Sequence, residues 1–268
     1  MRYLVVLIAL ASPSPLLAQE WEDAPAAAAV QNRQIVLAGG LDYETGGYGT
    51  GATVERMSVP ITAQASAGRL RIAAQLPWTR VTAPQNVVVP SGALGLPILV
   101  DPTGPAEIRT REGVGDLRLS AAYDLPMSGM ALSVRSAVKL PTASTSKGLG
   151  TGEVDYSVGA DLSIPLGKVT PFASLSYSIV GDPEGLDLRN SLSGQAGGSV
   201  QLGGQTAVHL GYGYARSTSE LVSDEQRIFG GLNMGLGDGT WLGLYGSSGL
   251  SDGAPDFGAG VSLAVSLD

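Results

Sequence analysis

Three consecutive segments near the middle of the chain alternate apolar and polar residues, and this pattern strongly constrains the fold. The segments are residues 117–125, 131–140 and 155–164. A two-residue period places successive side chains on opposite faces of a β-strand. The first connection between the segments is short, and the second is long and rich in glycine. Strands of about ten residues joined by alternately short and long connections are typical of a transmembrane β-barrel.

The same alternation recurs on both sides of this region. It predicts strands at residues 33–43, 54–65, 69–81, 169–180, 189–202, 205–216, 226–236, 240–248 and 257–266. The total is about twelve strands, an even number that places both ends of a barrel on the periplasmic side. Connections after even-numbered strands are short, and those after odd-numbered strands are longer. A soluble β-sandwich is the alternative, although it has no reason to sort its loops in this way.

We therefore predict an all-β fold over residues 33–268. It is an antiparallel, up-and-down transmembrane β-barrel with short periplasmic turns and long extracellular loops. Closure is demanded physically, because lipid cannot satisfy the backbone donors and acceptors of an open sheet edge.

Composition supports this class and excludes others. Mean hydropathy is only slightly positive, which is too weak for a bundle of membrane helices but suits strands that are apolar on one face. The formal net charge of −8 argues against a nucleic-acid partner. The absence of cysteine excludes disulfides and thiolate metal sites.

Residues 1–18 have the layout of a signal peptide. Arg2 precedes an apolar run at residues 4–11, and Ala18 is the expected cleavage position. The run is too short to span a membrane as a helix. Residues 19–32 are predicted to form a flexible periplasmic lead or a short helix in the barrel mouth. The expected location is the outer membrane of a Gram-negative bacterium.

Residues 82–111 form the longest segment without a strand pattern. Five prolines exclude a central strand there, and the apolar pieces at 87–89 and 96–100 are unusual for a solvated loop. Loops of this length are usually functional or disordered. We predict an extracellular loop that folds inward or contacts a hydrophobic solute.

The strand period also predicts which polar side chains point into the lumen and could set selectivity. These candidates are Arg69, Arg71, Arg118, Asp124, Arg135, Lys139, Asp155, Asp161, His209 and Arg227. Two interpretations stay open. The charges could form a salt-bridged ladder that fills the barrel, or they could line a channel biased towards anions. A barrel of about twelve strands lies between the filled eight-stranded and the open sixteen-stranded types.

Aromatic residues near strand ends predict a membrane-interface girdle. In transmembrane barrels such side chains lie where the hydrocarbon core meets the headgroups. The expected girdle residues are Tyr43, Trp78, Tyr177, Tyr214 and Trp241.

No catalytic site, cofactor or metal is predicted. His209 is the single histidine, so a Ser/His pair has one candidate. Twelve-stranded outer-membrane phospholipases use such a pair on the lipid-facing surface, whereas the strand period points His209 into the lumen. The glycines from Gly148 to Gly152 precede a strand rather than the helix that a phosphate loop requires. Acidic pairs such as Asp182 and Glu184 fit solvation or ion selectivity better than hydrolysis.

Three short motifs resemble a known outer-membrane family. They are Gly113-Val-Gly-Asp116, Lys139-Leu-Pro-Thr142, and Leu149-Gly-Thr-Gly152 followed by Asp155-Tyr156. In this order and spacing the chain resembles the barrels of the MetA-pathway of phenol degradation, over residues 112–181. The resemblance implies a transporter of small, hydrophobic or aromatic solutes. It also implies outer-membrane lipid and the barrel assembly machinery as partners.

The sequence therefore predicts a passive outer-membrane channel or facilitator, and no enzyme. Two alternatives remain. One is a structural or adhesive barrel with a plugged lumen, and the other is a lipid-modifying barrel enzyme.

Overall fold

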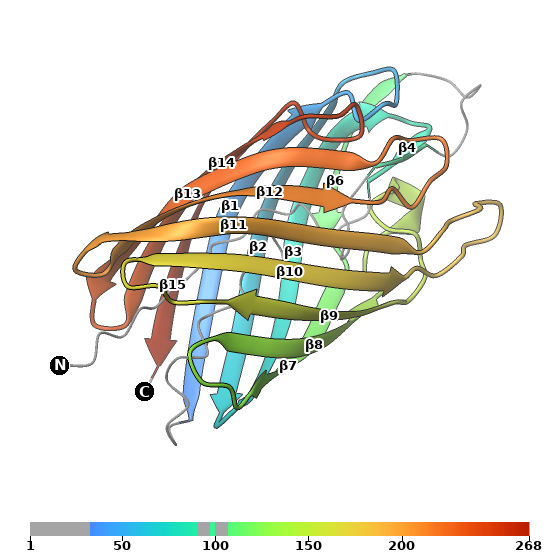
Figure 1. Cartoon of the computed structure of the whole chain (residues 1–268). Helices are drawn as coiled ribbons and strands as arrows, with labels where there is room; N and C mark the ends of the chain where they lie inside the picture. The colour runs from blue at the N-terminus through green and yellow to red at the C-terminus, as the bar shows by residue number, and fades with distance from the viewer. Residues whose placement is uncertain (1–32, 90–96, 100–106, 268) are drawn as a thin grey trace.

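The computed structural model describes residues 33–89, 97–99 and 107–267, which form a closed antiparallel β-barrel (Figure 1). The wall strands are β1 (Gln34–Gly46), β2 (Val54–Ala67), β3 (Leu70–Pro84), β6 (Ile108–Val114), β7 (Leu117–Leu125), β8 (Ala131–Leu140), β9 (Asp155–Ser163), β10 (Val169–Ile179), β11 (Ser191–Gly203), β12 (Thr206–Ala215), β13 (Glu225–Gly237), β14 (Thr240–Gly249) and β15 (Phe257–Leu267). Because β1 pairs with both β2 and β15, the sheet closes on itself. The signal peptide and the lead predicted for residues 1–32 lie outside the described residues.

β6 and β7 are two parts of one wall strand. Trp78 of β3 pairs with Val114 of β6, and Gln75 of β3 pairs with Arg118 of β7. One extra residue on the β6–β7 side separates these pairings, so Gly115 and Asp116 form a β-bulge. Counted in this way, the barrel has the twelve antiparallel strands that the alternation predicts.

The connections differ between the two ends of the barrel. Those at one end, the turn end, are tight, as between β13 and β14. There Asp238 and Gly239 both have positive φ angles, 49° and 69°, as a two-residue type I′ hairpin turn requires. The connections at the other end, the loop end, are long, and they lie towards the upper right of Figure 1.

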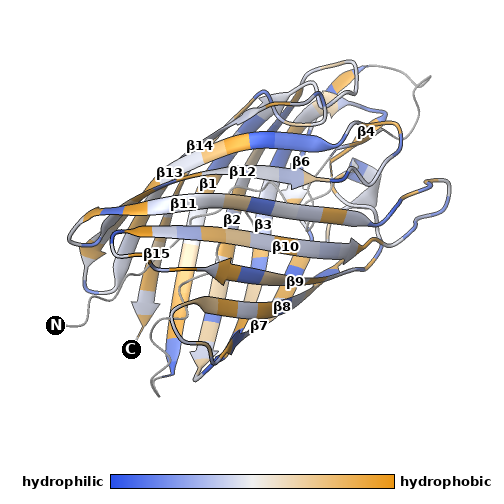
Figure 2. Cartoon of the chain, viewed as in Figure 1, coloured by the Kyte–Doolittle hydropathy of each residue, from blue (hydrophilic) through white to orange (hydrophobic). Residues whose placement is uncertain are grey.

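The wall is polar inside and apolar outside. Most of the fully buried side chains on the strands are serine, threonine or charged residues, whereas outward positions such as Leu210 and Ile61 are 67% and 66% exposed. Figure 2 shows the two kinds of residue interleaved along the wall strands. Within the described part of the chain, no helix is long and apolar enough to cross a membrane.

The loop predicted at residues 82–111 is only partly irregular. β3 runs on to Pro84 and β6 begins at Ile108, so both ends of the segment belong to the wall. Pro84 is compatible with this because it ends β3, where no further ladder donor is needed.

The described residues between these strand ends pack on the inward face of the wall, in agreement with the predicted inward fold. β4 (Val87–Val88) pairs with β5 (Ile98–Leu99). Val87 and Val89 are buried against Val81 and Ala83, which lie on the inward face of β3. Residues 90–96 and 100–106 lie outside the described residues.

Candidate functional site in the barrel lumen

The inward side chains divide the lumen into two arcs. The charged arc consists of β1, β2, β3, β7, β8 and β9. Its buried or partly buried inward charges are Asp42, Glu44, Arg56, Arg71, Arg118, Asp124, Arg135, Lys139, Asp155 and Asp161. The small-residue arc consists of β10 to β15, where the inward positions are mainly glycine, serine and alanine. In the described strands of this arc, inward charges occur at Glu225 and Arg227, both on β13.

The structure places nearly all predicted lumen residues on the inward face. Those that are buried are Arg71, Arg118, Asp124, Arg135, Lys139, Asp155, His209 and Arg227. Asp161 is partly buried and pairs with Arg135. The prediction for Arg69 is corrected: β3 begins at Leu70, so Arg69 lies exposed in the preceding turn.

Carboxylates balance the basic side chains of the charged arc. Arg71 Nη2 lies 3.1 Å from Asp124 Oδ1 on the neighbouring strand, and Arg135 pairs with Asp161. Lys139 Nζ lies 2.8 Å from Asp155 Oδ2. These cross-strand pairs cancel the excess of positive charge on which a bias towards anions would depend.

A buried ion cluster lies near the loop end and joins the two arcs. Glu44 pairs with Arg56, and its Oε1 lies 3.7 Å from Arg227 Nη1. Arg227 Nε lies 3.2 Å from Glu225 Oε1. The side chains of these four residues are at most 3% exposed. Since β14 and β15 separate β13 from β1, the contact needs small residues between them; a Cβ at Gly258 would lie 3.3 Å from Glu44 Cγ.

Sequence reasoning missed Glu44, Arg56 and Glu225 as site residues. Glu44 and Glu225 fell just outside the strands predicted at residues 33–43 and 226–236, although they continue the inward period of β1 and β13. Arg56 lay within a predicted strand on its inward face, so the two-residue period alone could have identified it.

An aromatic band covers the small-residue arc. It consists of Phe172, His209, Phe229 and Tyr245, from four different strands. The ring centroids of Phe172 and Phe229 are 6.4 Å apart, and those of His209 and Phe229 are 6.3 Å apart. Such separations are favourable for aromatic pairs.

Each ring of the aromatic band lies over a glycine of a neighbouring strand. A Cβ at Gly197 would lie 2.6 Å from Phe172 Cζ, and one at Gly231 would lie 2.7 Å from His209 Cε1. The inward glycines therefore make room for the rings.

His209 belongs to this aromatic band and faces inward. Its Nδ1 has no hydrogen-bond partner among the described residues, and the ring packs against Phe229. In a Ser/His pair that faces the lipid, the histidine would have to lie on the outward face of β12. In the same described part of the chain, no group of three or more potential metal ligands occurs.

The motifs that carry the family resemblance meet at the loop end of the charged arc. Asp116 Oδ1, in the bulge, accepts a hydrogen bond from Ala143 N (3.0 Å). Asp116 Oδ2 also lies 3.8 Å from Lys139 Nζ, which donates to Thr151 Oγ1 at 3.2 Å. A Cβ at Gly150 would lie 3.1 Å from Asp116 Oδ2, so the loop approaches the bulge as closely as glycine permits.

Thr142 completes this motif cluster. Its Oγ1 donates to Gly115 O and accepts from Leu117 N, both at 2.8 Å. The hydroxyl therefore replaces ladder hydrogen bonds that the bulge leaves unmade. The three motifs fix the loop between β8 and β9 to the wall, which is a structural role.

An apolar loop cluster lies beside the motif cluster. Its buried members are Tyr48, Val54, Val81, Ala83, Val87, Val89, Ala143 and Leu149. Arg111 Nη2 donates to Val87 O at 2.8 Å, and Val89 N donates to Gly148 O at 3.3 Å. Burial and the negative charge of Glu44 raise the pKa of the Tyr48 phenol well above its ordinary value, so it stays neutral.

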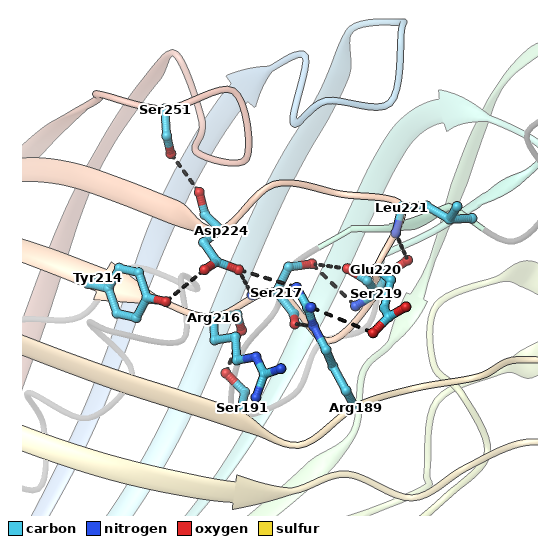
Figure 3. Close-up of polar contacts among 10 residues, drawn as sticks. All are labelled: Arg189, Ser191, Tyr214, Arg216, Ser217, Ser219, Glu220, Leu221, Asp224 and Ser251. Atoms are coloured by element: carbon cyan, nitrogen blue, oxygen red, sulfur yellow. Dashed lines mark hydrogen bonds and ion pairs between the residues drawn. The ribbon is translucent and has the colours of Figure 1, made fainter.

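A second network joins the loops of the small-residue arc (Figure 3). Arg189 Nε donates to Ser217 O at 2.7 Å. The Asp224 carboxylate accepts from Tyr214 Oη at 2.7 Å and from Ser217 N at 3.0 Å. Ser251 Oγ donates to Asp224 O at 2.7 Å. The loops after β10, β12 and β14 are therefore held to one another.

Four of the predicted girdle residues lie on outward positions of the wall strands. Tyr43, Tyr177 and Tyr214 lie close to the ends of β1, β10 and β12. Trp78 lies in mid-strand, because β3 extends past it. The prediction for Trp241 is corrected: it pairs with the buried Ala264 and shares the inward register of Tyr245.

Comparison with solved structures supports the fold. The chain is similar to the COG4313 outer membrane channel from Pseudomonas putida F1, with a TM-score of 0.67 and 16% identity, covering 91% of this chain and 99% of that one. It is also similar to the NanC porin (TM-score 0.53, 7% identity, covering 86% and 100%). The β domain of the Bordetella autotransporter BrkA gives 0.51 at 13% identity, covering 88% and 100%.

These likenesses show a barrel fold of the outer-membrane type, which both channels and an autotransporter domain adopt. Function must therefore be argued from the lumen rather than from the fold. No protein-family model matches the chain, and no curated protein matches it. Membership of the MetA-pathway family stays a prediction.

Proposed function

We propose that this protein is an outer-membrane channel that passes small solutes through the barrel lumen. The observation that carries the proposal is the inward face, where charged and hydroxyl side chains line a barrel whose outward face is apolar. In lipid such a wall separates a polar interior from hydrocarbon. The short turns then face the periplasm and the long loops face outside the cell.

The two arcs favour solutes that have an apolar or aromatic part beside a polar one. β7 of the charged arc and β13 of the small-residue arc lie opposite each other in the strand order. A solute between them would meet guanidinium and carboxylate groups on one side and the aromatic band on the other. Small aromatic solutes fit this arrangement best, since a ring can pack on Phe172 while its polar substituent faces the charged arc.

A plugged structural barrel is the second candidate, and the ion cluster favours it. Glu44, Arg56, Glu225 and Arg227 are nearly inaccessible and connect strands that are not neighbours. Buried charges that pair in this way can close part of a lumen. The lipid-modifying enzyme gains no support, because His209 faces inward and packs against Phe229.

Single-channel recording of the refolded protein in a planar bilayer separates the two candidates. We expect discrete conductance steps from protein whose folding is shown independently, for example by its heat-modifiable mobility on a gel. Silence from folded protein would contradict the channel and support the plugged barrel. Loss of chloride current when a small aromatic acid is added would support the proposed solute class.

A further inference from the structure

Asn233 is a buried amide on the inward face of β13 that makes no side-chain hydrogen bond within the described part of the chain. Both its Oδ1 and its Nδ2 lack a partner there, although the residue is only 2% exposed. Buried polar side-chain atoms in folded proteins nearly always have a partner, because an unmade bond costs the free energy of desolvation. A bound molecule that bonds to the amide would remove this cost.

Ser262 lies across a strip of bare backbone from Asn233. Asn233 pairs with Gly243 of β14, and Gly243 pairs in turn with Ser262 of β15, so the three residues form one row of the wall. Two strand spacings, about 10 Å, separate the two polar residues. Ser262 is 3% exposed, and its Oγ has no hydrogen-bond partner among the described residues. Since Gly243 has no side chain, one small ring above it could bond to both.

His209 adds a third unpartnered group on the loop-end side of this row. Its ring lies over Gly231, two residues before Asn233, where an added Cβ would be 2.9 Å from His209 Nε2. Its Nδ1 has no hydrogen-bond partner within residues 33–89, 97–99 and 107–267. Three polar side chains, from β12, β13 and β15, therefore lie around Gly243.

Two rings of β14 lie on either side of Gly243. Trp241 and Tyr245 share its inward register, and each is two residues, or about 7 Å, away along the strand. The Tyr245 ring lies over Gly260, and its Oη donates to Asp42 Oδ1 at 2.7 Å. Aromatic rings in such positions supply apolar surfaces against which a ring-shaped ligand packs.

The three unpartnered groups select a ligand by what they donate and accept. An amide and a hydroxyl both donate and accept, and a neutral imidazole does each with one nitrogen. Hydroxyl groups match such a set, whereas an anion would only accept and a cation would only donate. One hydroxyl could not bond to all three side chains, so the matching ligand is an uncharged ring with several hydroxyl groups.

We call this group of residues the hydroxyl site: Asn233, Ser262, His209, Trp241 and Tyr245. We propose that it binds an uncharged ring that carries three or more hydroxyl groups. A trihydroxybenzene and a pyranose sugar share this chemistry, because each has a face without hydroxyl groups and a hydroxylated edge. The inference rests on the proposed channel function for the route by which the ligand reaches the lumen.

Isothermal titration calorimetry of the refolded protein in detergent micelles tests the site, with phloroglucinol (a trihydroxybenzene) and glucose as probes. We expect at least one of them to bind, and phenol, which has one hydroxyl, to bind at least tenfold more weakly than the better probe. Binding of glucose alone would assign a sugar, and binding of phloroglucinol alone an aromatic triol. Binding of neither probe, or of phenol as tightly as the better probe, would overturn the proposal.

Substitutions locate the bound probe. Asn233→Leu removes both hydrogen-bonding atoms of the amide and should weaken binding of the better probe about tenfold; Ser262→Ala should weaken it about threefold. Gln195→Leu is the matched control, because Gln195 is also a buried inward amide of the small-residue arc but lies on β11, outside the hydroxyl site. It should bind as the unmodified protein does. Equal affinities of Asn233→Leu and Gln195→Leu would show that the probe binds elsewhere.

Thermal unfolding distinguishes a binding role of Asn233 from a structural one. Since its amide makes no bond within the described chain, Asn233→Leu without probe should unfold at the same temperature as the unmodified protein or higher. The better probe should raise the unfolding temperature of the unmodified protein and of Gln195→Leu, but not that of Asn233→Leu. A marked loss of stability in Asn233→Leu without probe would assign the amide a structural role and remove it from the site.

Binding in micelles does not require conduction, so this proposal and the channel fail separately. A protein that conducts in a planar bilayer but binds neither probe would retain the channel and overturn the hydroxyl site. Folded protein that binds a probe at this site but shows no conductance would retain the site and overturn the open lumen.

Discussion

The two arcs of the lumen have the same apolar outer face but differ in the side chains that line their inner face. The charged arc fills its interior with long side chains that pair across neighbouring strands, as Arg71 does with Asp124. The small-residue arc leaves space with glycine and fills it with rings, as Gly197 does for Phe172. The stability of the charged arc should therefore depend on the balance of its charges. The stability of the small-residue arc should depend on the volume of its inward side chains.

The largest loss of stability is expected from a substitution in the ion cluster, where the two arcs meet. Arg227→Ala should destabilise the barrel by about 3–5 kcal/mol, because it leaves the buried carboxylate of Glu225 without its counter-charge and leaves Glu44 with Arg56 alone. Equilibrium unfolding by urea in detergent micelles measures the change. The control is Arg80→Ala, whose pair with Glu112 is 3.9 Å long and more than half exposed; it should cost less than about 1 kcal/mol. Equal losses would show that burial does not distinguish the two pairs.

A smaller loss of stability is expected when a side chain is added at an inward glycine of the small-residue arc, because the aromatic rings fill the space there. Gly197→Ala should cost about 1–3 kcal/mol, since its Cβ would overlap Phe172 and the backbone of β12. The adjacent Gly198 has nothing within 4 Å of an added Cβ, so Gly198→Ala should be neutral or slightly stabilising. Thermal unfolding of the two variants under the same conditions decides the matter. If the Gly197→Ala variant is as stable as Gly198→Ala, the inward glycines are not needed to make room for the rings of the aromatic band.

A third effect concerns the motif cluster, which the small-residue arc lacks. Thr142→Val deletes the hydrogen bonds to Gly115 and Leu117 and should cost about 1 kcal/mol. Its proteolysis in the loop between β8 and β9 should also become faster. Ser144→Ala removes only an exposed contact with Ser146 and should leave both measurements unchanged. If the two variants behave alike, the motif cluster does not hold the loop.

Much of the fold follows from the two-residue period. It predicts the strands, the faces of residues such as Arg135 and Tyr177, and the sorting of short and long connections. It fails where a local feature breaks the period. The bulge at Asp116 inserts one residue, and the turn before Leu70 releases Arg69 from the strand.

The site is less predictable than the fold because the period gives the face of a residue but not its partners. Glu44 meets Arg227 through the closure of the barrel and across two intervening strands, which no local pattern encodes. The motif cluster is similar: its residues are visible in the sequence, yet their shared contact with the bulge requires the register.

The central claim is that the charged arc, and not the small-residue arc, sets the electrostatics of a conducting lumen. The most direct test is the reversal potential in a salt gradient of Arg135→Ala with Lys139→Ala, compared with Ser176→Ala with Ser178→Ala. The first variant leaves Asp116, Asp155 and Asp161 without these counter-charges, so its ion preference should shift towards cations relative to the unmodified protein. The second should not shift. Identical reversal potentials from two conducting variants would contradict the account.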